Sequence, residues 1–274
     1  MIQRIHQIYA AALLFLLFSS CLLHPAMSQA IIGARDLAMG STSVAHQGSK
    51  WALFSNPALA DSEVSTLSVY AMQFSGFSEL TDMAGAFTMP LKFGIVSAGV
   101  HRFGFELFSE NRFLIGFKKN YNRLHYGIVL NYHSVSFGGE YSSVSAIGIH
   151  AGVAAEIFDG VMLGARATNV NQPSFQGSDE SLPRDLSVGF SYRLNQTLVL
   201  TSDLVKDVQF PVSVRFGAEA EIFQEFYGRA GFTTEPVTYS AGFGYSPSEW
   251  SVNVAVQRHE LLGMSPAVDL SIRF

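Results

Sequence analysis

Apolar and polar side chains alternate along most of this chain, and the last ten residues show the pattern clearly. Every second position there is apolar, and the apolar set is Val268, Leu270, Ile272 and Phe274. Successive side chains of a β-strand point to opposite faces, so a period of two is typical of a strand with one apolar face. The end of the chain is therefore predicted to be such a strand, finishing in an aromatic residue.

The same alternation recurs from residue 63 onward, in segments of about ten residues with turn residues between them. These segments predict fourteen strands, an even number, as single-chain bacterial barrels have. The expected ranges are 63–75, 82–90, 92–102, 110–120, 123–135, 142–158, 160–170, 184–194, 196–205, 210–222, 225–234, 237–246, 249–258 and 265–274.

Composition indicates where these strands reside. Only 14% of the residues are charged, whereas a soluble domain usually carries about 25%. After residue 30 no apolar run approaches the roughly 20 residues that a transmembrane helix needs. The polar strand faces carry mostly Ser, Gly, Thr and Asn, whereas the outer face of a soluble β-sandwich would be charged. We therefore predict an all-β fold, a 14-stranded antiparallel transmembrane β-barrel with apolar side chains toward lipid.

The connections between the predicted strands differ in length. The longer ones are expected to be the third (103–109), the fifth (136–141), the seventh (171–183) and the thirteenth (259–264). Short periplasmic turns that alternate with longer outside loops are typical of outer-membrane barrels. This alternation predicts an integral protein of a Gram-negative bacterial outer membrane, with both termini in the periplasm.

The first residues have the pattern of an export signal. Arg4 precedes an apolar run over 8–23, and small residues follow at Ala26 and Ser28. We expect a cleaved signal peptide over 1–28, followed by a hatch or plug segment over 29–62 and the barrel over 63–274. The single cysteine, Cys21, lies in the apolar run, so its lipidation is the alternative. With a cleaved signal the mature protein has no thiol, which excludes disulfides and thiolate metal sites.

Residues 29–62 do not alternate, and they are rich in Gly, Ala and Ser. A barrel of fourteen strands leaves a wide lumen. A compact segment with Trp51 and Phe54 as anchors can pack inside it. Asn56 is kept out of the helical region by Pro57, and its amide is expected to cap the turn that leads to the first strand. The alternative is a plain turn before that strand.

The motifs of this segment resemble the N-terminal region of the FadL-type superfamily, which includes the long-chain fatty-acid transporter and the PorV/PorQ proteins of the type IX secretion system. The resemblance implies a fourteen-stranded outer-membrane barrel whose N-terminal hatch segment folds into the lumen. The residues that carry it are Gly33, Arg35, Met39, Gly40, Asn56, Pro57 and Ala58.

The resemblance implies two functions, neither of them enzymatic. A PorV/PorQ-like protein acts as a scaffold or adaptor in protein export, similar to type IX secretion. The alternative is a FadL-like transporter that passes hydrophobic small molecules such as fatty acids across the outer membrane. A transporter of that kind needs a concave apolar site, and the predicted loops are too short to build one. The sequence therefore favours the scaffold.

Charged residues at inward positions are the other candidates for function. We expect them to pair with one another or with the hatch backbone; the alternative is a ring of like charges that selects ions. The residues singled out are Arg166, Arg193, Arg215, Glu219 and Arg229. No Gly-x-Ser-x-Gly elbow and no histidine pair at helical metal spacing is present. We predict no enzyme activity, no metal and no cofactor.

The expected partners follow from these assignments. The terminal Phe274 resembles the signal by which outer-membrane barrels are recognised for insertion, so the barrel-assembly machinery is one partner and outer-membrane lipid another. The third is a secretion-system protein or a hydrophobic ligand, according to which function holds. A formal net charge of −5 excludes a basic nucleic-acid surface.

Overall fold

The structure is a computed structural model that describes residues 32–60, 63–74, 77–138, 143–177, 180–260 and 263–274, without the side chains of residues 77 and 78. The predicted signal peptide over 1–28, with Cys21, lies outside the described residues. No helix among the described residues is long and apolar enough to cross a membrane.

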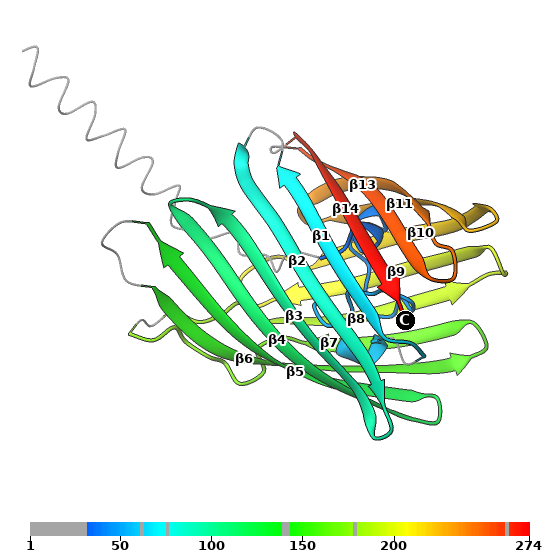
Figure 1. The fold of residues 1–274 in the computed structure, drawn as a ribbon, viewed down its shortest axis with the longest axis horizontal. Coiled ribbons are helices and arrows are strands. Elements are labelled where there is room, and N and C mark those ends of the chain that lie inside the picture. Colours follow the sequence, from blue (N-terminus) through cyan, green and yellow to red (C-terminus); the bar gives the residue numbers. More distant parts are fainter. Residues whose placement is uncertain (1–31, 61–62, 75–76, 139–142, 178–179, 261–262) are drawn as a thin grey trace, which may run out of the picture. The chain divides into compact units, whose positions relative to one another are not determined.

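The strands that the structure describes close into one antiparallel barrel (Figure 1). Each pairs with its neighbours in sequence, and the first pairs with the last. The predicted fold class, a closed barrel of fourteen strands, is confirmed. The strands are β1 (Thr66–Phe74), β2 (Phe77–Leu91), β3 (Gly94–Phe105), β4 (Phe108–Tyr121), β5 (Leu124–Phe137), β6 (Val144–Phe158), β7 (Val161–Ala167), β8 (Asp185–Arg193), β9 (Leu198–Asp207), β10 (Ser213–Phe223), β11 (Phe226–Thr234), β12 (Val237–Tyr245), β13 (Trp250–His259) and β14 (Gly263–Arg273).

The predicted connections are partly wrong. We call the rim where β1 begins and β14 ends the proximal rim, and the opposite one the distal rim. The seventh connection, residues 168–184, is the longest between described strands, as expected. The third was expected to be long, but it shrinks to residues 106–107, because β3 and β4 continue to Phe105 and from Phe108. Phe105 and Phe108 pair across the two strands and their rings lie 6.5 Å apart, so aromatic packing extends this hairpin. The thirteenth shrinks likewise to residues 260–262.

The alternation of the sequence sets the two faces of the wall. On β8, Leu186 is 59% exposed and the next residue, Ser187, is fully buried. Apolar side chains of this kind face outward all round the barrel, as the sequence predicts, while the small and polar ones face the lumen. At the proximal rim, the Phe274 ring is exposed and stacks 6.3 Å from that of Phe87.

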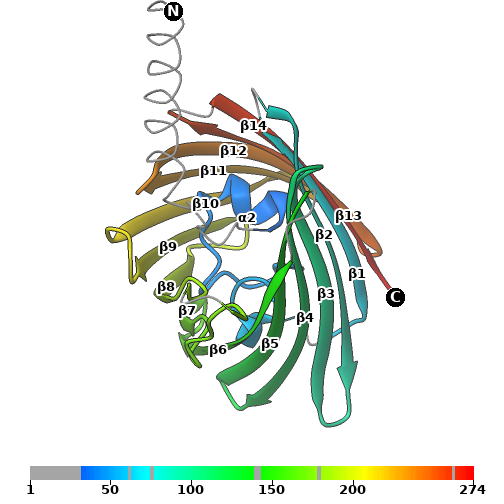
Figure 2. The ribbon, with the colours of Figure 1, turned by 90° about the vertical axis from the view of Figure 1, so that its left-hand side faces the viewer.

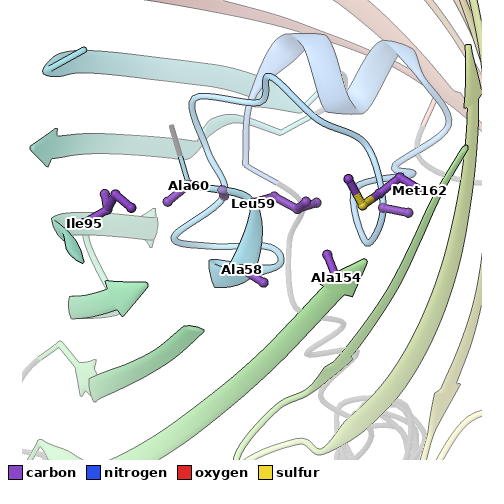
Figure 3. Packing of buried hydrophobic residues seen from close by; sticks show 8 residues of the cluster. Ala58, Leu59, Ala60, Ile95, Ala154 and Met162 are labelled. Carbon is purple, nitrogen blue, oxygen red and sulfur yellow. The ribbon is translucent and has the colours of Figure 1, made fainter. Parts of the chain in front are cut away.

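Residues 32–60, here called the lumenal segment, lie inside the barrel (Figure 2). The segment contains a short helix, α2 (Ala34–Ala38), which packs against β11 to β14. It also contains a single 3-10 turn, η1 (Pro57–Leu59), which packs against β4 to β6. Because the strands point their large apolar side chains outward, this segment supplies much of the buried apolar interior. In Figure 3, Leu59 lies between Ile95 and Met162 of the wall.

Candidate functional site

The lumenal segment touches the wall at strand positions that carry glycine. A Cβ built on Gly231 would lie 1.9 Å from the amide nitrogen of Gly40, and one on Gly164 would lie 2.0 Å from the carbonyl oxygen of Val44. No other residue leaves room for such an approach of two backbones. The wall glycines that the backbone of the segment approaches are Gly127, Gly164, Gly189, Gly217 and Gly231. Side chains of the segment lie against Gly99, Gly116, Gly152 and Gly242.

Residues 49–60, here called the anchor, are held mainly by apolar packing. Trp51 is 1% exposed, and its ring lies 5.8 Å from that of Tyr70 on β1. The rings of Phe54 and His101 lie 6.3 Å apart at an angle of 66°. The side chain of Asn56 accepts a hydrogen bond from the amide of Ala58 at 3.1 Å, which confirms the predicted cap. Its Nδ2 donates to the carbonyl oxygens of Val44, at 2.7 Å, and Val153, at 3.1 Å.

Residues 32–46, here called the arm, combine buried apolar side chains with polar contacts to the wall. Arg35 donates to both oxygens of Glu219 on β10, from Nε at 2.8 Å and from Nη2 at 2.7 Å. Arg229 of β11 donates to the same carboxylate from Nε at 2.5 Å. Bidentate, charge-assisted pairs of this type are among the stronger polar contacts in proteins. Gly33 (φ 109) and Gly40 (φ 65) both have the left-handed φ that favours glycine.

Wall carboxylates also bind the backbone of the arm directly. Oδ2 of Asp269 on β14 accepts from the amides of Ala34, at 2.7 Å, and Arg35, at 3.3 Å. Oδ2 of Asp203 on β9 accepts from the amides of Ser43, at 2.7 Å, and Val44, at 3.0 Å. The two carboxylates are buried, so each amide pair compensates part of the cost of burying a charge.

The charges predicted at inward positions do face the lumen, and most of them have partners. Arg166 binds Asp185 at 2.8 Å, and Glu219 binds two arginines as described. Nη1 of Arg215 donates to the carbonyl oxygen of Ser41 in the arm at 3.1 Å. These contacts match the expected pairing with other charges and with the hatch backbone. Arg193 lies elsewhere, at the edge of a proximal cavity.

That cavity has a volume of about 530 Å³ and opens beneath the lumenal segment near the proximal rim. A second cavity of about 260 Å³ adjoins it and shares the side chains of Arg35, Gln47, Arg193, Val199 and Glu219. Both are bordered by the arm. Within the described ranges, no group of three or more His, Cys, Asp or Glu residues is arranged to hold a metal ion.

Two titratable side chains of the arm are buried beside this network. Burial raises the pKa of Asp36 to about 7, although the Ser49 hydroxyl and the positive charge of Arg35 oppose the shift. Burial and then the charge of Arg35 lower the pKa of His46 to about 4. Nδ1 of His46 lies 4.0 Å from Oδ1 of Asp36. At pH 6 the docked arm therefore holds a protonated Asp36 beside a neutral His46.

The distal half of the lumen carries a further polar layer. His101 is hydrogen-bonded to Asp82 at 2.5 Å through Nε2, and Nε of Arg112 donates to its Nδ1 at 3.0 Å. The long connection 168–184 folds over this layer, where Phe175 is buried with its ring 5.7 Å from that of His133. The polar residues at every second position of these strands could be recognised in the sequence, but the position of the connection could not.

Aromatic side chains follow toward the distal rim. By strand parity they continue the lumenal face of β1, β3, β4 and β5. We call them the distal aromatic row: Phe74, Phe103, Phe105, Phe108 and Phe137. Adjacent members lie 5.8 Å (Phe74 to Phe103), 6.5 Å (Phe105 to Phe108) and 5.8 Å (Phe108 to Phe137) apart, within the range of favourable aromatic pairs.

Comparison with known proteins gives a fold but no close relative. No protein-family model and no curated protein sequence matches the chain. Among solved structures, the Pseudomonas putida toluene transporter TodX is 13% identical, with a TM-score of 0.63 over 87% of this chain and 96% of its own. The CymD monoaromatic hydrocarbon channel is 13% identical, with a TM-score of 0.67 over 91% and 99%. A Pseudomonas aeruginosa FadL homologue is 11% identical, with a TM-score of 0.58 over 88% and 98%.

At these identities the likeness establishes the fold. The chain has the architecture of FadL-type outer-membrane channels, a class of integral outer-membrane barrels. None of these structures is a PorV or PorQ protein, so the comparisons give no support to that branch of the resemblance.

The paired burial of Asp36 and His46 predicts compensating effects of pH on docking of the arm. A released Asp36 has an ordinary pKa of 3.8 and a released His46 one of 6.5. As the pH rises from 4 to 6.5, docking is weakened through Asp36, because the docked carboxyl holds its proton more strongly. Over the same interval docking is strengthened through His46, because the released imidazole holds its proton more strongly. The wild-type dependence should therefore be nearly flat.

A substitution of either group should reveal the pH dependence of arm docking that the other group causes. With Asp36→Asn, docking should strengthen by up to about 1.4 kcal/mol per pH unit from pH 4 to 6.5, and with His46→Gln it should weaken by a similar amount. The measurement is Trp51 emission during urea titration in a Trp250→Phe background, which leaves one tryptophan in the chain. Parallel profiles for the two variants would contradict the assignment.

Backbone contact at Gly231 predicts that one methyl group disturbs docking. In Gly231→Ala the new Cβ would overlap Gly40, so the arm must shift and Trp51 emission should move to longer wavelength. Gly85→Ala is the matched control on β2, where a Cβ meets Val100 at 3.6 Å and the carbonyl oxygen of Ser68 at 3.9 Å, both ordinary contacts. Equal spectra for the two variants would show that the approach at Gly231 is not tight.

Proposed function

We propose that this protein is an outer-membrane channel for small hydrophobic molecules, with the lumenal segment as its hatch. The observation that carries the proposal is the distal aromatic row, which places an apolar surface at the entrance to an otherwise polar lumen. Phe105 and Phe137 are 37% and 45% exposed, so their rings are accessible from the distal side. Exposed aromatic rings at a mouth are suited to the capture of an apolar molecule from dilute solution.

The predicted loops are too short to build the concave apolar site that a transporter needs, but the distal aromatic row supplies an apolar surface at the distal rim. The loops are indeed short, but the extended strands β3, β4 and β5 supply apolar side chains that loops were expected to supply. In this proposal the distal rim faces the outside and the proximal rim, with the large cavity, faces the periplasm. The fold agrees with it, since TodX is described as a toluene transporter and CymD as a monoaromatic hydrocarbon channel.

A PorV/PorQ-like scaffold in protein export is the second candidate, and one observation favours it. The long connection 168–184 is anchored to the barrel. Asn171 bonds to β6 in both directions, since its Oδ1 accepts from the amide of Ile149 and its Nδ2 donates to the carbonyl oxygen of Ile147, each at 2.9 Å, and Leu182 is buried. A connection fixed in this way offers a preformed surface to another protein. The scaffold role predicts a stoichiometric partner in mild-detergent extracts, and a lone barrel there would count against it.

Uptake measurements test the channel. Proteoliposomes that contain the protein should take up toluene faster than empty vesicles when the permeation step is made limiting by a lipopolysaccharide-rich outer leaflet. Phe103→Ser with Phe108→Ser should lower the initial rate several-fold, because the capture surface loses two of its rings. Phe93→Ser, an exposed ring at the proximal rim, is the matched control.

Removal of the hatch gives an independent result. A barrel without residues 33–60 should conduct ions in planar bilayers in long-lived openings, because nothing then fills the lumen. Unchanged conductance would contradict the hatch. Toluene uptake that is insensitive to the paired Phe103 and Phe108 substitutions would contradict capture by the aromatic row.

A further inference from the structure

Two carboxylates flank one ring of the distal aromatic row. Phe103 on β3 pairs with Asp82 on β2 and, on its other side, with Glu110 on β4. Paired residues of neighbouring antiparallel strands have Cβ atoms about 4.5–5.5 Å apart. Asp82 is 1% exposed, whereas the Phe103 side chain is half-buried. A molecule that lies on this ring therefore lies beside both carboxylates.

One oxygen of Asp82 has no hydrogen-bond donor. Its Oδ1 accepts from Nε2 of His101, because Nδ1 of that imidazole already accepts from Arg112. Oδ2 has no hydrogen-bond partner within the described part of the chain. The residue that pairs with Asp82 from β1 is Met72, whose thioether has no hydrogen to donate. A buried carboxylate oxygen without a donor is costly, so this position favours a ligand that donates.

Glu110 also has free acceptor capacity. Its carboxylate accepts no hydrogen bond from any residue of the described ranges; Nε2 of His133 lies 3.5 Å from Oε2 without making one. Its pairing partner on β5 is Val135, which has no polar side-chain atom. The side chain of Glu110 is 12% exposed, so its oxygens keep some accessible surface. Phe103 thus has a carboxylate in need of a donor on either side.

The charge beside the ring is negative. The carboxylates of Asp82 and Glu110 outnumber the guanidinium of Arg112, which lies one lumenal position farther from the distal rim on β4. That guanidinium lies against the lumenal segment, with its Cζ 5.9 Å from the centre of the Phe54 ring. Beside the row an anion is therefore repelled and a cation attracted.

Aromatic rings and carboxylates together suit an ammonium group. The face of an aromatic ring attracts a cation, and an ammonium has enough N–H donors to serve both carboxylates. A hydroxyl has a single donor and can serve only one of them. Charge-assisted hydrogen bonds are also stronger than neutral ones.

We propose that the distal aromatic row, together with Asp82 and Glu110, is a binding site for hydrophobic amines, that is, molecules with an apolar body and one protonated amino group. The apolar body lies against the rings of Phe103 and Phe74, which are 5.8 Å apart. The ammonium donates to Oδ2 of Asp82 and to the carboxylate of Glu110. This inference rests on the proposed channel function and narrows its substrates to those that carry a cation.

Four ligands of similar size test the chemistry of the site. Benzylamine, benzyl alcohol, toluene and benzoate carry at pH 7 a cation, a neutral donor, no polar group and an anion, respectively. Equilibrium dialysis of each radiolabelled compound against the protein in detergent, with protein-free micelles as the blank, gives its Kd. Benzylamine should bind at least about tenfold more tightly than benzyl alcohol, and benzoate should bind least. Equal affinity for benzylamine and benzyl alcohol, or tighter binding of benzoate, would overturn the proposal.

Neutral variants of the two carboxylates locate the site. Asp82→Asn with Glu110→Gln keeps the shape of both side chains but removes their charge, so benzylamine should lose its advantage over benzyl alcohol. Toluene binding to the same variant checks that the aromatic row is intact. Asp185→Asn is the matched control, since each oxygen of this buried wall carboxylate already has a donor, Arg166 or Thr168. An advantage that survives in the double variant, or is lost equally in the control, would place the amine elsewhere.

Toluene also separates failure of this inference from failure of the channel. If toluene uptake depends on the aromatic row but benzylamine binds no better than benzyl alcohol, the site does not recognise amines and the channel stands. If proteoliposomes take up neither toluene nor benzylamine, the proposed function itself fails.

Discussion

The structure depends on one constraint, which is that the lumen of a fourteen-strand barrel must be filled by backbone lying on backbone. The wall turns its apolar side chains to lipid, so the lumenal face offers little to pack against. Glycines at positions such as Gly164 and Gly231 let the lumenal segment approach the strands directly. The amides and carbonyls thus brought together need partners, and wall residues such as Asp203 and Asp269 provide them.

This constraint explains why a segment with few large side chains can close so wide a barrel. Small residues let it follow the curved wall, and its two aromatic side chains, Trp51 and Phe54, lie in the anchor. Polar contacts fix the remainder in one register, since each carboxylate accepts from a particular pair of amides.

The sequence predicts the barrel well because the alternation of apolar and polar residues over many strands indicates directly which side chains face lipid. Local chemistry was predictable too, as the cap of Asn56 on Ala58 shows. The contacts of the wall carboxylates with the arm were not predictable, because Asp269 binds main-chain amides 234 and 235 positions away, and every residue type except proline supplies an amide. The distal aromatic row was missed for another reason: strand parity identified a lumenal face there, but loop chemistry was expected where β3 and β4 in fact continue as strands.

The account joins an apolar entrance, a polar lumen and a hatch bound by wall carboxylates into a path for a small hydrophobic molecule. Its central claim is that such a molecule binds first at the distal aromatic row. The most direct measurement is the anomalous bromine signal from a crystal of the protein soaked in bromobenzene. The account predicts a peak beside Phe103 and Phe108 on the lumenal face. Bromine found only on the lipid-facing wall, or nowhere on the protein, would contradict it.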